Sequence, residues 1–224
     1  MSTPTMEVML SEDSKELKRL AQAAVSRKDF TSGFIYLSQA IRLEPDNYEL
    51  YLERNLCFME EEQFHFALKD AEVLIRLRPG DPQGYKRVGE VYFTTQNYSQ
   101  SLQAFLKSFQ VSKTTAEKEK VMEWVKKARK EFSKQSMLDR EYPFLGAAVG
   151  IVLAAIGITG DYLIRRHETF LAHPLMKVLA VILTALVGYG FAYLLRNHIK
   201  NSRAFLLEPP IDLLSEEEPN RKND

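Results

Sequence analysis

The sequence predicts an all-α protein in which a helical repeat domain precedes two long apolar helices. The first observation is a period of 34 residues across positions 14–113, where the phrase AIRLEP at 40–45 returns as LIRLRP at 74–79. The second is a pair of segments, 143–160 and 178–195, that each run for eighteen residues without a charge. As helices, segments of this composition are long enough to cross a hydrocarbon core of about 30 Å.

The same class of residue returns at each step of 34 inside the repeat. Two columns hold large apolar or aromatic residues and a third holds small ones: Leu17, Tyr51 and Tyr85; Phe30, Phe64 and Tyr98; Gly33, Ala67 and Ser101. In two further columns the middle repeat exchanges large for small, so that Leu37 and Phe105 correspond to Ala71, and Ala40 and Ser108 to Leu74. Lys113 stands where a third proline would fall, which is typical of the last repeat of an array.

A 34-residue period with two helices per unit resembles the tetratricopeptide repeat. The resemblance implies three helix pairs that stack into a superhelix, because one pair cannot bury its apolar face alone. We expect a polar segment, residues 1–13, before the array. The expected helices are 14–27 and 31–43, 48–60 and 64–77, and 83–94 and 98–111.

In this family the first helix of each pair lines a concave groove. One subgroup, the carboxylate-clamp co-chaperones, uses converging cationic and amide side chains there to bind a chaperone tail that ends in Glu-Glu-Val-Asp. The matching positions in this chain are Lys18, Gln22, Glu53, Gln83 and Arg87. Lys18 and Arg87 agree with the subgroup, whereas Glu53 puts a carboxylate inside a carboxylate receptor and adds like-charge repulsion.

Three alternatives follow for the groove: a chaperone tail, another peptide or protein, or no ligand at all. Arg54 follows Glu53 as in the subgroup. The apolar residues Leu52, Leu56, Met59 and Phe93 can face the same groove and would suit a more apolar ligand. For each of these four, packing between neighbouring repeats is the alternative interpretation.

The segment 114–141 is predicted to be a charged helix with one apolar face. Val121, Trp124, Val125, Ala128 and Phe132 recur at spacings of three and four. That face is expected to cap the open end of the third repeat, with Trp124 as its anchor. The lysines of the opposite face also suit contact with anionic lipid headgroups: Lys126, Lys127, Lys130 and Lys134.

The two apolar segments predict a transmembrane hairpin, with spans at 142–164 and 175–196 and a short loop at 165–174. Basic residues before the first span and after the second predict that both chain ends face the cytosol. Small residues form a stripe on each helix, at Gly146 and Gly150 and at Thr184 and Gly188. The stripes suit either packing within the hairpin or dimerisation.

Composition argues against several classes of function. With 30 basic and 30 acidic residues, the chain shows no net charge that would favour nucleic acid. Cys57 is the only cysteine and is expected to be a buried thiol, and the four histidines are scattered, so we expect no metal, cofactor or catalytic site. The tail, 197–224, is expected to be disordered.

The sequence therefore predicts an integral membrane adaptor that binds a protein or peptide and recruits it to an intracellular membrane. The endoplasmic reticulum is the first expectation for that membrane and the mitochondrial outer membrane the second. The alternative is a membrane-shaping, fission or tethering protein in which the hairpin is the active part. Residues 1–13 lack a basic start and an apolar core, which argues against a cleaved secretory signal.

Overall fold

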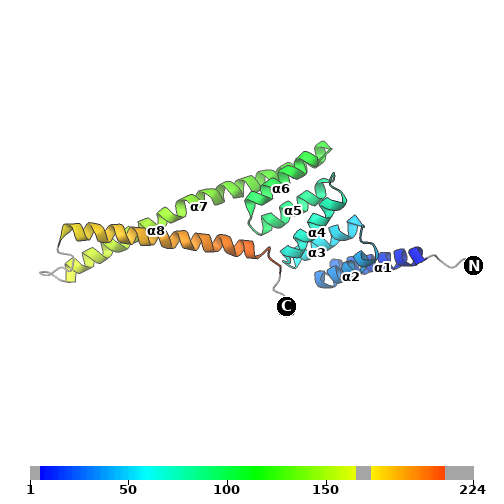
Figure 1. The fold of residues 1–224 in the computed structure, drawn as a ribbon, viewed down its shortest axis with the longest axis horizontal. Helices are drawn as coiled ribbons and strands as arrows, with labels where there is room; N and C mark the ends of the chain where they lie inside the picture. The colour runs from blue at the N-terminus through cyan, green and yellow to red at the C-terminus, as the bar shows by residue number, and fades with distance from the viewer. Residues whose placement is uncertain (1–5, 165–172, 210–224) are drawn as a thin grey trace, which may run out of the picture. The chain divides into compact units, whose positions relative to one another are not determined.

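A computed structural model describes residues 6–164 and 173–209, and its regular elements there are α-helices (Figure 1). In order, they are α1 (Met6–Ser26), α2 (Phe30–Leu43), α3 (Tyr48–Glu60), α4 (Phe64–Leu77), α5 (Pro82–Thr94), α6 (Tyr98–Val111), α7 (Thr115–Ile164) and α8 (Pro174–Phe205). The chain divides into two compact units. The repeat unit contains the described residues up to Val91 and those from Phe205 onward, and the hairpin unit contains those of Tyr92–Ala204.

The predicted all-helical repeat fold is confirmed. Helices α2 to α6 begin within one residue of the predicted positions and end at the predicted residues. The predicted start of the first helix was wrong, because α1 begins at Met6, eight residues before the predicted start at 14. The segment from Met6 to Leu10 contains good helix formers and no glycine or proline, and the helix therefore extends through it.

The 34-residue period is visible in the backbone as well as in the side chains. Lys28, Glu62 and Gln96 have φ angles of 62°, 56° and 60°, and each lies two residues after the end of the first helix of a pair. At the first of these turns the Asp29 N–H donates to Ala24 O (3.0 Å) and the Lys28 N–H to Val25 O (2.9 Å). This is a Schellman cap, whose left-handed position favours glycine.

Replacing Glu62 with glycine is therefore expected to stabilise the repeat unit by about 1 kcal/mol, since an L-residue is strained in the left-handed region. Glu62 is exposed, so no packing is lost. The urea midpoint of Cys57 labelling measures the effect. Lys69→Gly, within α4, is the matched control and should lower stability by about 1 kcal/mol. A lower midpoint for Glu62→Gly would contradict the assignment of the turn.

The columns in which large and small residues change places are buried in all three repeats. Leu37 and Ala40 on α2 are 0% exposed, as are Ala71 and Leu74 on α4 and Phe105 and Ser108 on α6. Each second helix thus buries one large and one small side chain at these two positions. The exchange of sizes keeps the summed volume similar, which a close-packed core requires.

Cys57 lies in the core of the repeat unit, 1% exposed, in a cluster with Leu37, Ile41 and Leu50. Burial and, to a smaller extent, the charge of Glu53 raise the pKa of the thiol from 9.0 to about 11. At pH 8 we expect the native thiol to react with a maleimide at least about 100-fold more slowly than the thiol of the urea-unfolded chain, because two pKa units remove that much thiolate. Equal rates in water and in urea would show that Cys57 is not in the core.

In the hairpin unit, α6 and the first part of α7 share a core. Phe105, Val121, Val125 and Ala128 are buried there. Trp124 stacks on Phe105 with ring centroids 5.4 Å apart. The apolar face that the sequence predicts for residues 114–141 therefore packs against the second helix of the third repeat.

The predicted connector and the first predicted span belong to one helix, α7, which runs without interruption from Thr115 to Ile164 through Pro143. A proline inside a helix removes one N–H donor and costs about 3 kcal/mol. Long helical segments on both sides of Pro143 maintain the helix across it. Both α7 and α8 are long and apolar enough to cross a membrane.

The predicted tail also begins later than expected. Residues 197–205 continue α8, and the Leu207 carbonyl oxygen lies 2.9 Å from His65 Nδ1 within the repeat unit. Leu207 packs beside Phe58 and Phe64 in that core. Residues 197–205 contain no glycine or proline to stop the helix, which therefore continues past the apolar segment. The rest of the predicted tail, 210–224, and most of the predicted loop, 165–172, lie outside the described residues.

Candidate peptide-binding groove

The structure brings together three of the predicted groove residues. Lys18 and Gln22 lie one turn apart on α1 and so face the same side of that helix. Lys18 Nζ lies 3.1 Å from Glu53 Oε1 on α3, and Gln22 Nε2 donates to the same oxygen at 3.2 Å. The side chains of Lys18 and Glu53 are 32% and 27% exposed. Glu53 thus lies at a partly solvated contact between two repeats.

Leu56 lies beside this contact. It follows Glu53 by three positions on α3, which places the two residues on one face of the helix. Its side chain is 42% exposed. Leu56 therefore offers apolar surface next to the Lys18, Gln22 and Glu53 cluster.

The predicted residues of α5 make contacts within their own helix. Arg87 Nη1 donates to Glu90 Oε2 at 2.7 Å, and Lys86 Nζ lies 3.5 Å from the other oxygen of Glu90. The Gln83 backbone N–H donates to Asp81 Oδ1 at 2.9 Å, which satisfies a free donor at the start of the helix.

Sequence reasoning missed Glu90 as a member of this set. The signal was present, because Glu90 follows Lys86 and Arg87 by four and three positions, the spacings at which opposite charges pair on a helix. Arg87 therefore has an internal carboxylate as its partner, as Lys18 does.

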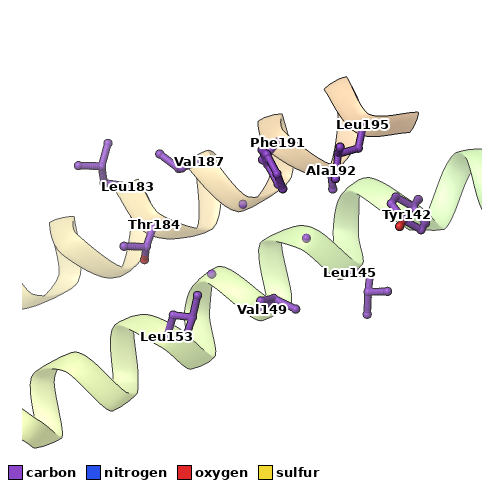
Figure 2. A pocket seen from close by; sticks show the side chains of 13 residues that line it. Tyr142, Leu145, Val149, Leu153, Leu183, Thr184, Val187, Phe191, Ala192 and Leu195 are labelled. Carbon is purple, nitrogen blue, oxygen red and sulfur yellow. The ribbon is translucent and has the colours of Figure 1, made fainter. Parts of the chain in front are cut away.

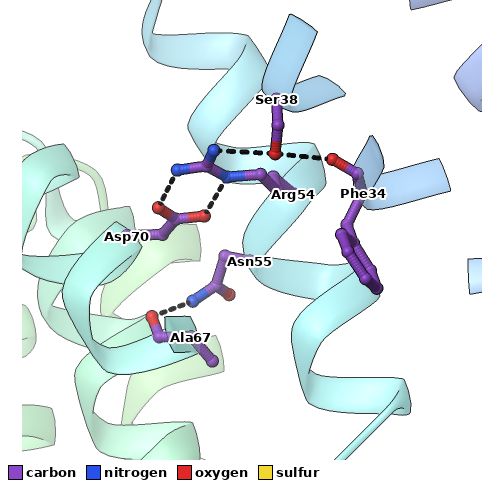
Figure 3. A network of polar contacts seen from close by, with 6 residues as sticks. All are labelled: Phe34, Ser38, Arg54, Asn55, Ala67 and Asp70. Carbon is purple, nitrogen blue, oxygen red and sulfur yellow. Dashed lines mark hydrogen bonds and ion pairs between the residues drawn. The ribbon is translucent and has the colours of Figure 1, made fainter. Parts of the chain in front are cut away.

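Arg54, which follows Glu53, is held in a different contact (Figure 3). Its Nε and Nη2 donate to the two carboxylate oxygens of Asp70 on α4, at 2.8 Å and 2.6 Å, and its Nη1 donates to Ser38 Oγ at 3.0 Å. The Asp70 side chain is 4% exposed, and this burial raises the pKa of its carboxyl although Arg54 opposes the shift. The bidentate pair joins α3 to α4, and the bond to Ser38 joins α3 to α2.

The small residues of the two long helices form the second predicted set, and they meet within one chain (Figure 2). A Cβ added to Gly188 would overlap the carbonyl oxygen of Gly146, and one added to Gly150 would overlap that of Thr184. Figure 2 shows Thr184 and Ala192 of α8 pointing toward α7. This geometry corresponds to the alternative in which the two stripes pack within the hairpin.

Asp139 joins the same two helices just outside their apolar segments. It forms ion pairs with Arg196 and with Lys200, whose Nζ lies 3.0 Å from Asp139 Oδ2. Desolvation raises the pKa of this carboxyl, but hydrogen bonds from Lys200 and Arg196 outweigh it and lower the pKa overall. Asp139 is therefore charged at neutral pH and fixes α7 to α8 beside the apolar segments.

The described residues hold no cluster of three or more His, Cys, Asp or Glu side chains that would suit a metal ion. The candidate groove residues present a neutralised polar cluster on α1 and α3, a second neutralised cluster on α5 and an exposed leucine. Such a surface can bind a peptide through shape, apolar contact and exchange of hydrogen bonds.

Comparison with known proteins agrees with the repeat fold. The sequence matches no model of a protein family. The Heat shock protein sti1 homolog of Schizosaccharomyces pombe is 39% identical over 75 residues, which are 34% of this chain and 13% of that protein. The E3 ubiquitin-protein ligase TTC3 of Mus musculus is 32% identical over 101 residues, which are 45% of this chain and 5% of that protein. The chain thus matches only a small part of each relative.

Among solved structures, the TPR2B domain of yeast Sti1 in its pHsp70 complex aligns with a TM-score of 0.50 and 14% identity, over 54% of this chain and 98% of that chain. At this identity the likeness concerns the fold. The repeats thus have the tetratricopeptide-repeat fold, and they are similar in sequence to a part of the sti1 homolog.

Proposed function

We propose that this protein is an adaptor of co-chaperone type, whose groove binds a peptide segment of a protein partner. The observation that carries the proposal is the convergence of Lys18, Gln22 and Glu53, from two repeats, beside the exposed Leu56. Polar side chains next to exposed apolar surface are what a peptide needs for orientation and for affinity.

The relatives support the same class of function. The sti1 homolog is a heat shock protein, and the solved structure of the TPR2B domain of yeast Sti1 is a complex with pHsp70. In this chain Glu53 and Glu90 neutralise Lys18 and Arg87. The similarity to these proteins supports a protein partner. The kind of peptide that this partner presents is inferred from the side chains of this chain.

We further propose that α7 and α8 anchor the protein in a membrane, with the repeats in the cytosol. Large aliphatic and aromatic side chains cover the outside of both helices, and Leu153, Leu163, Leu183 and Phe191 are each more than half exposed. A contiguous apolar surface of this extent is rare on a soluble monomer and is normal for helices in lipid. The endoplasmic reticulum and the mitochondrial outer membrane are the two candidate membranes.

A photo-crosslinking amino acid at Leu56 of the full-length protein in cells tests the adaptor function. We expect adducts with one discrete partner protein, identified by mass spectrometry, and loss of those adducts when Lys18 is replaced by glutamate. The same amino acid at Val73 on α4 is the position control. Adducts that are equally abundant at Val73, or that persist in Lys18→Glu, would exclude the groove as the binding surface.

Membrane attachment has its own test. The protein is expected to stay in the membrane pellet after extraction with alkaline carbonate, and protease added to intact organelles should remove the repeats. Release by carbonate would contradict the anchor. If the protein is anchored and Leu56 yields no adduct, while the full chain remodels vesicles, then the hairpin rather than the groove is the active part.

A further inference from the structure

We propose that Glu53 is an internal carboxylate that occupies the donors Lys18 and Gln22 and thereby excludes peptides ending in a carboxylate from the groove. Glu53 would then determine specificity. This inference deepens the proposed function and rests on it for the place where a peptide binds.

The geometry of the contact is that of a carboxylate receptor. A cationic donor, Lys18 Nζ, and an amide donor, Gln22 Nε2, approach Glu53 Oε1 at 3.1 Å and 3.2 Å. Both donors come from α1, and the acceptor comes from α3, 31 positions later than Gln22. Charged and amide donors that converge on one oxygen bind carboxylates well. Here the protein itself supplies the carboxylate.

The contact between Lys18 and Glu53 is partly exposed to solvent, so a ligand can compete for it. Lys18 and Glu53 retain 32% and 27% of their side-chain exposure, so solvent and a ligand can reach them. An ion pair this exposed contributes little to stability. Removing the charge of Glu53 should therefore leave the fold intact and free Lys18 and Gln22 for another acceptor.

The cations of α5 are occupied in the same way. Arg87 lies 2.7 Å and Lys86 3.5 Å from the carboxylate of Glu90. A ligand carboxylate would thus meet cations that are already paired, together with the charge of Glu53, and like charges in contact cost affinity. The native groove instead fits an uncharged segment that places an apolar side chain on Leu56.

Fluorescence anisotropy with the full chain in detergent micelles tests the inference. The probe is a labelled peptide that ends in Glu-Glu-Val-Asp with a free carboxyl terminus, and its amide form with neutral side chains is the uncharged reference. We expect Glu53→Gln to bind the acidic peptide at least about tenfold more tightly than the native protein, because the repulsion is removed. Adding Lys18→Ala should abolish this gain.

Glu72→Gln is the matched control, because it removes the same charge from an exposed position on α4. It should leave the affinity for the acidic peptide unchanged. Glu53→Asn repeats the test with a shorter side chain, and slow labelling of Cys57 verifies that each variant is folded. Folded Glu53 variants that bind the acidic peptide no better than the native protein would overturn the inference, as would an equal gain from Glu72→Gln.

The two proposals fail separately. Crosslinking at Leu56 that persists while Glu53→Gln gains nothing would overturn the role of Glu53 and keep the adaptor function. A gain in Glu53→Gln without any partner at Leu56 would keep the role of Glu53 and overturn the adaptor function.

Discussion

Replacing Asp70 with leucine is expected to lower the free energy of unfolding of the repeat unit by about 3–5 kcal/mol. The change leaves Arg54, whose side chain is 18% exposed, without the two hydrogen bonds of 2.8 Å and 2.6 Å that satisfy it. An unpaired charge in that position is more costly than the loss of the pair itself. The loss of stability is measured by urea titration, in which labelling of the buried Cys57 reports unfolding of the repeat unit.

The double variant Arg54→Met with Asp70→Leu is expected to recover most of that loss. Burial raises the pKa of the Asp70 carboxyl despite its bidentate partner, which indicates that desolvation offsets much of the ion pair's attraction. Methionine also keeps apolar contact with Tyr51 and Phe58, over whose rings the guanidinium lies at 5.5 Å. Ser38 still donates to the Phe34 carbonyl oxygen, so it is not left unsatisfied.

Glu72→Leu is the control for this series, because it removes a carboxylate from an exposed position of the same helix. Its effect on stability should stay within about 0.5 kcal/mol. A double variant as unstable as Asp70→Leu alone would show that the pair contributes directly to stability. In that case the attraction between Arg54 and Asp70 exceeds the cost of desolvating the two charges. The pair then stabilises the fold in addition to orienting α3, α4 and α2.

Periodicity was sufficient to predict the repeat fold. Columns 34 residues apart identified the buried positions, including Leu37, Ala71 and Phe105, because packing between stacked helices requires apolar side chains at a fixed spacing. Helix ends next to prolines were also placed well, since Pro45 and Pro79 each follow a helix that ends two residues earlier.

Boundaries without such breakers were placed poorly. Neither glycine nor proline lies between Met6 and Ser14 to stop a helix, and α1 begins eight residues before the predicted start at 14. Pro143 does not interrupt α7, because long helical segments on both sides maintain the helix across it. Whether a single residue ends a helix therefore depends on the stability of the helical segments around it.

The contacts of the candidate site were harder to predict than its members. Family resemblance pointed to Lys18, Gln22 and Glu53 as separate positions, and Glu53 was interpreted as a repulsive group. That it accepts from both α1 side chains depends on how α1 and α3 pack, which a single sequence does not specify. Glu90 lay outside the positions compared with the family, although its spacing from Arg87 was readable.

Replacing Gly188 with isoleucine is expected to separate α7 from α8. The Gly188 Cα faces the Gly146 carbonyl group, and any Cβ there would overlap that oxygen. Backbones this close tolerate no side chain, and overpacking of even a single group costs about 1–3 kcal/mol. The ion pairs of Asp139 with Arg196 and Lys200 lie about two helical turns away from this contact, so they do not relieve the overlap at Gly188.

Crosslinking of the full chain in lipid nanodiscs measures the separation. In a Cys57→Ala background, cysteines replace Phe144 and Tyr189, whose ring centroids lie 5.8 Å apart on α7 and α8. A short bis-maleimide should link them within one chain, and Gly188→Ile should reduce the yield about tenfold if the packing is lost. Gly190→Ile, on the same helix but with no atom within 4 Å of an added Cβ, should leave the yield unchanged.

An unchanged yield in Gly188→Ile would contradict glycine-mediated packing. A different result would be crosslinks between two chains that are lost in Gly188→Ile. In that case the small residues join the hairpins of two copies rather than the two helices of one.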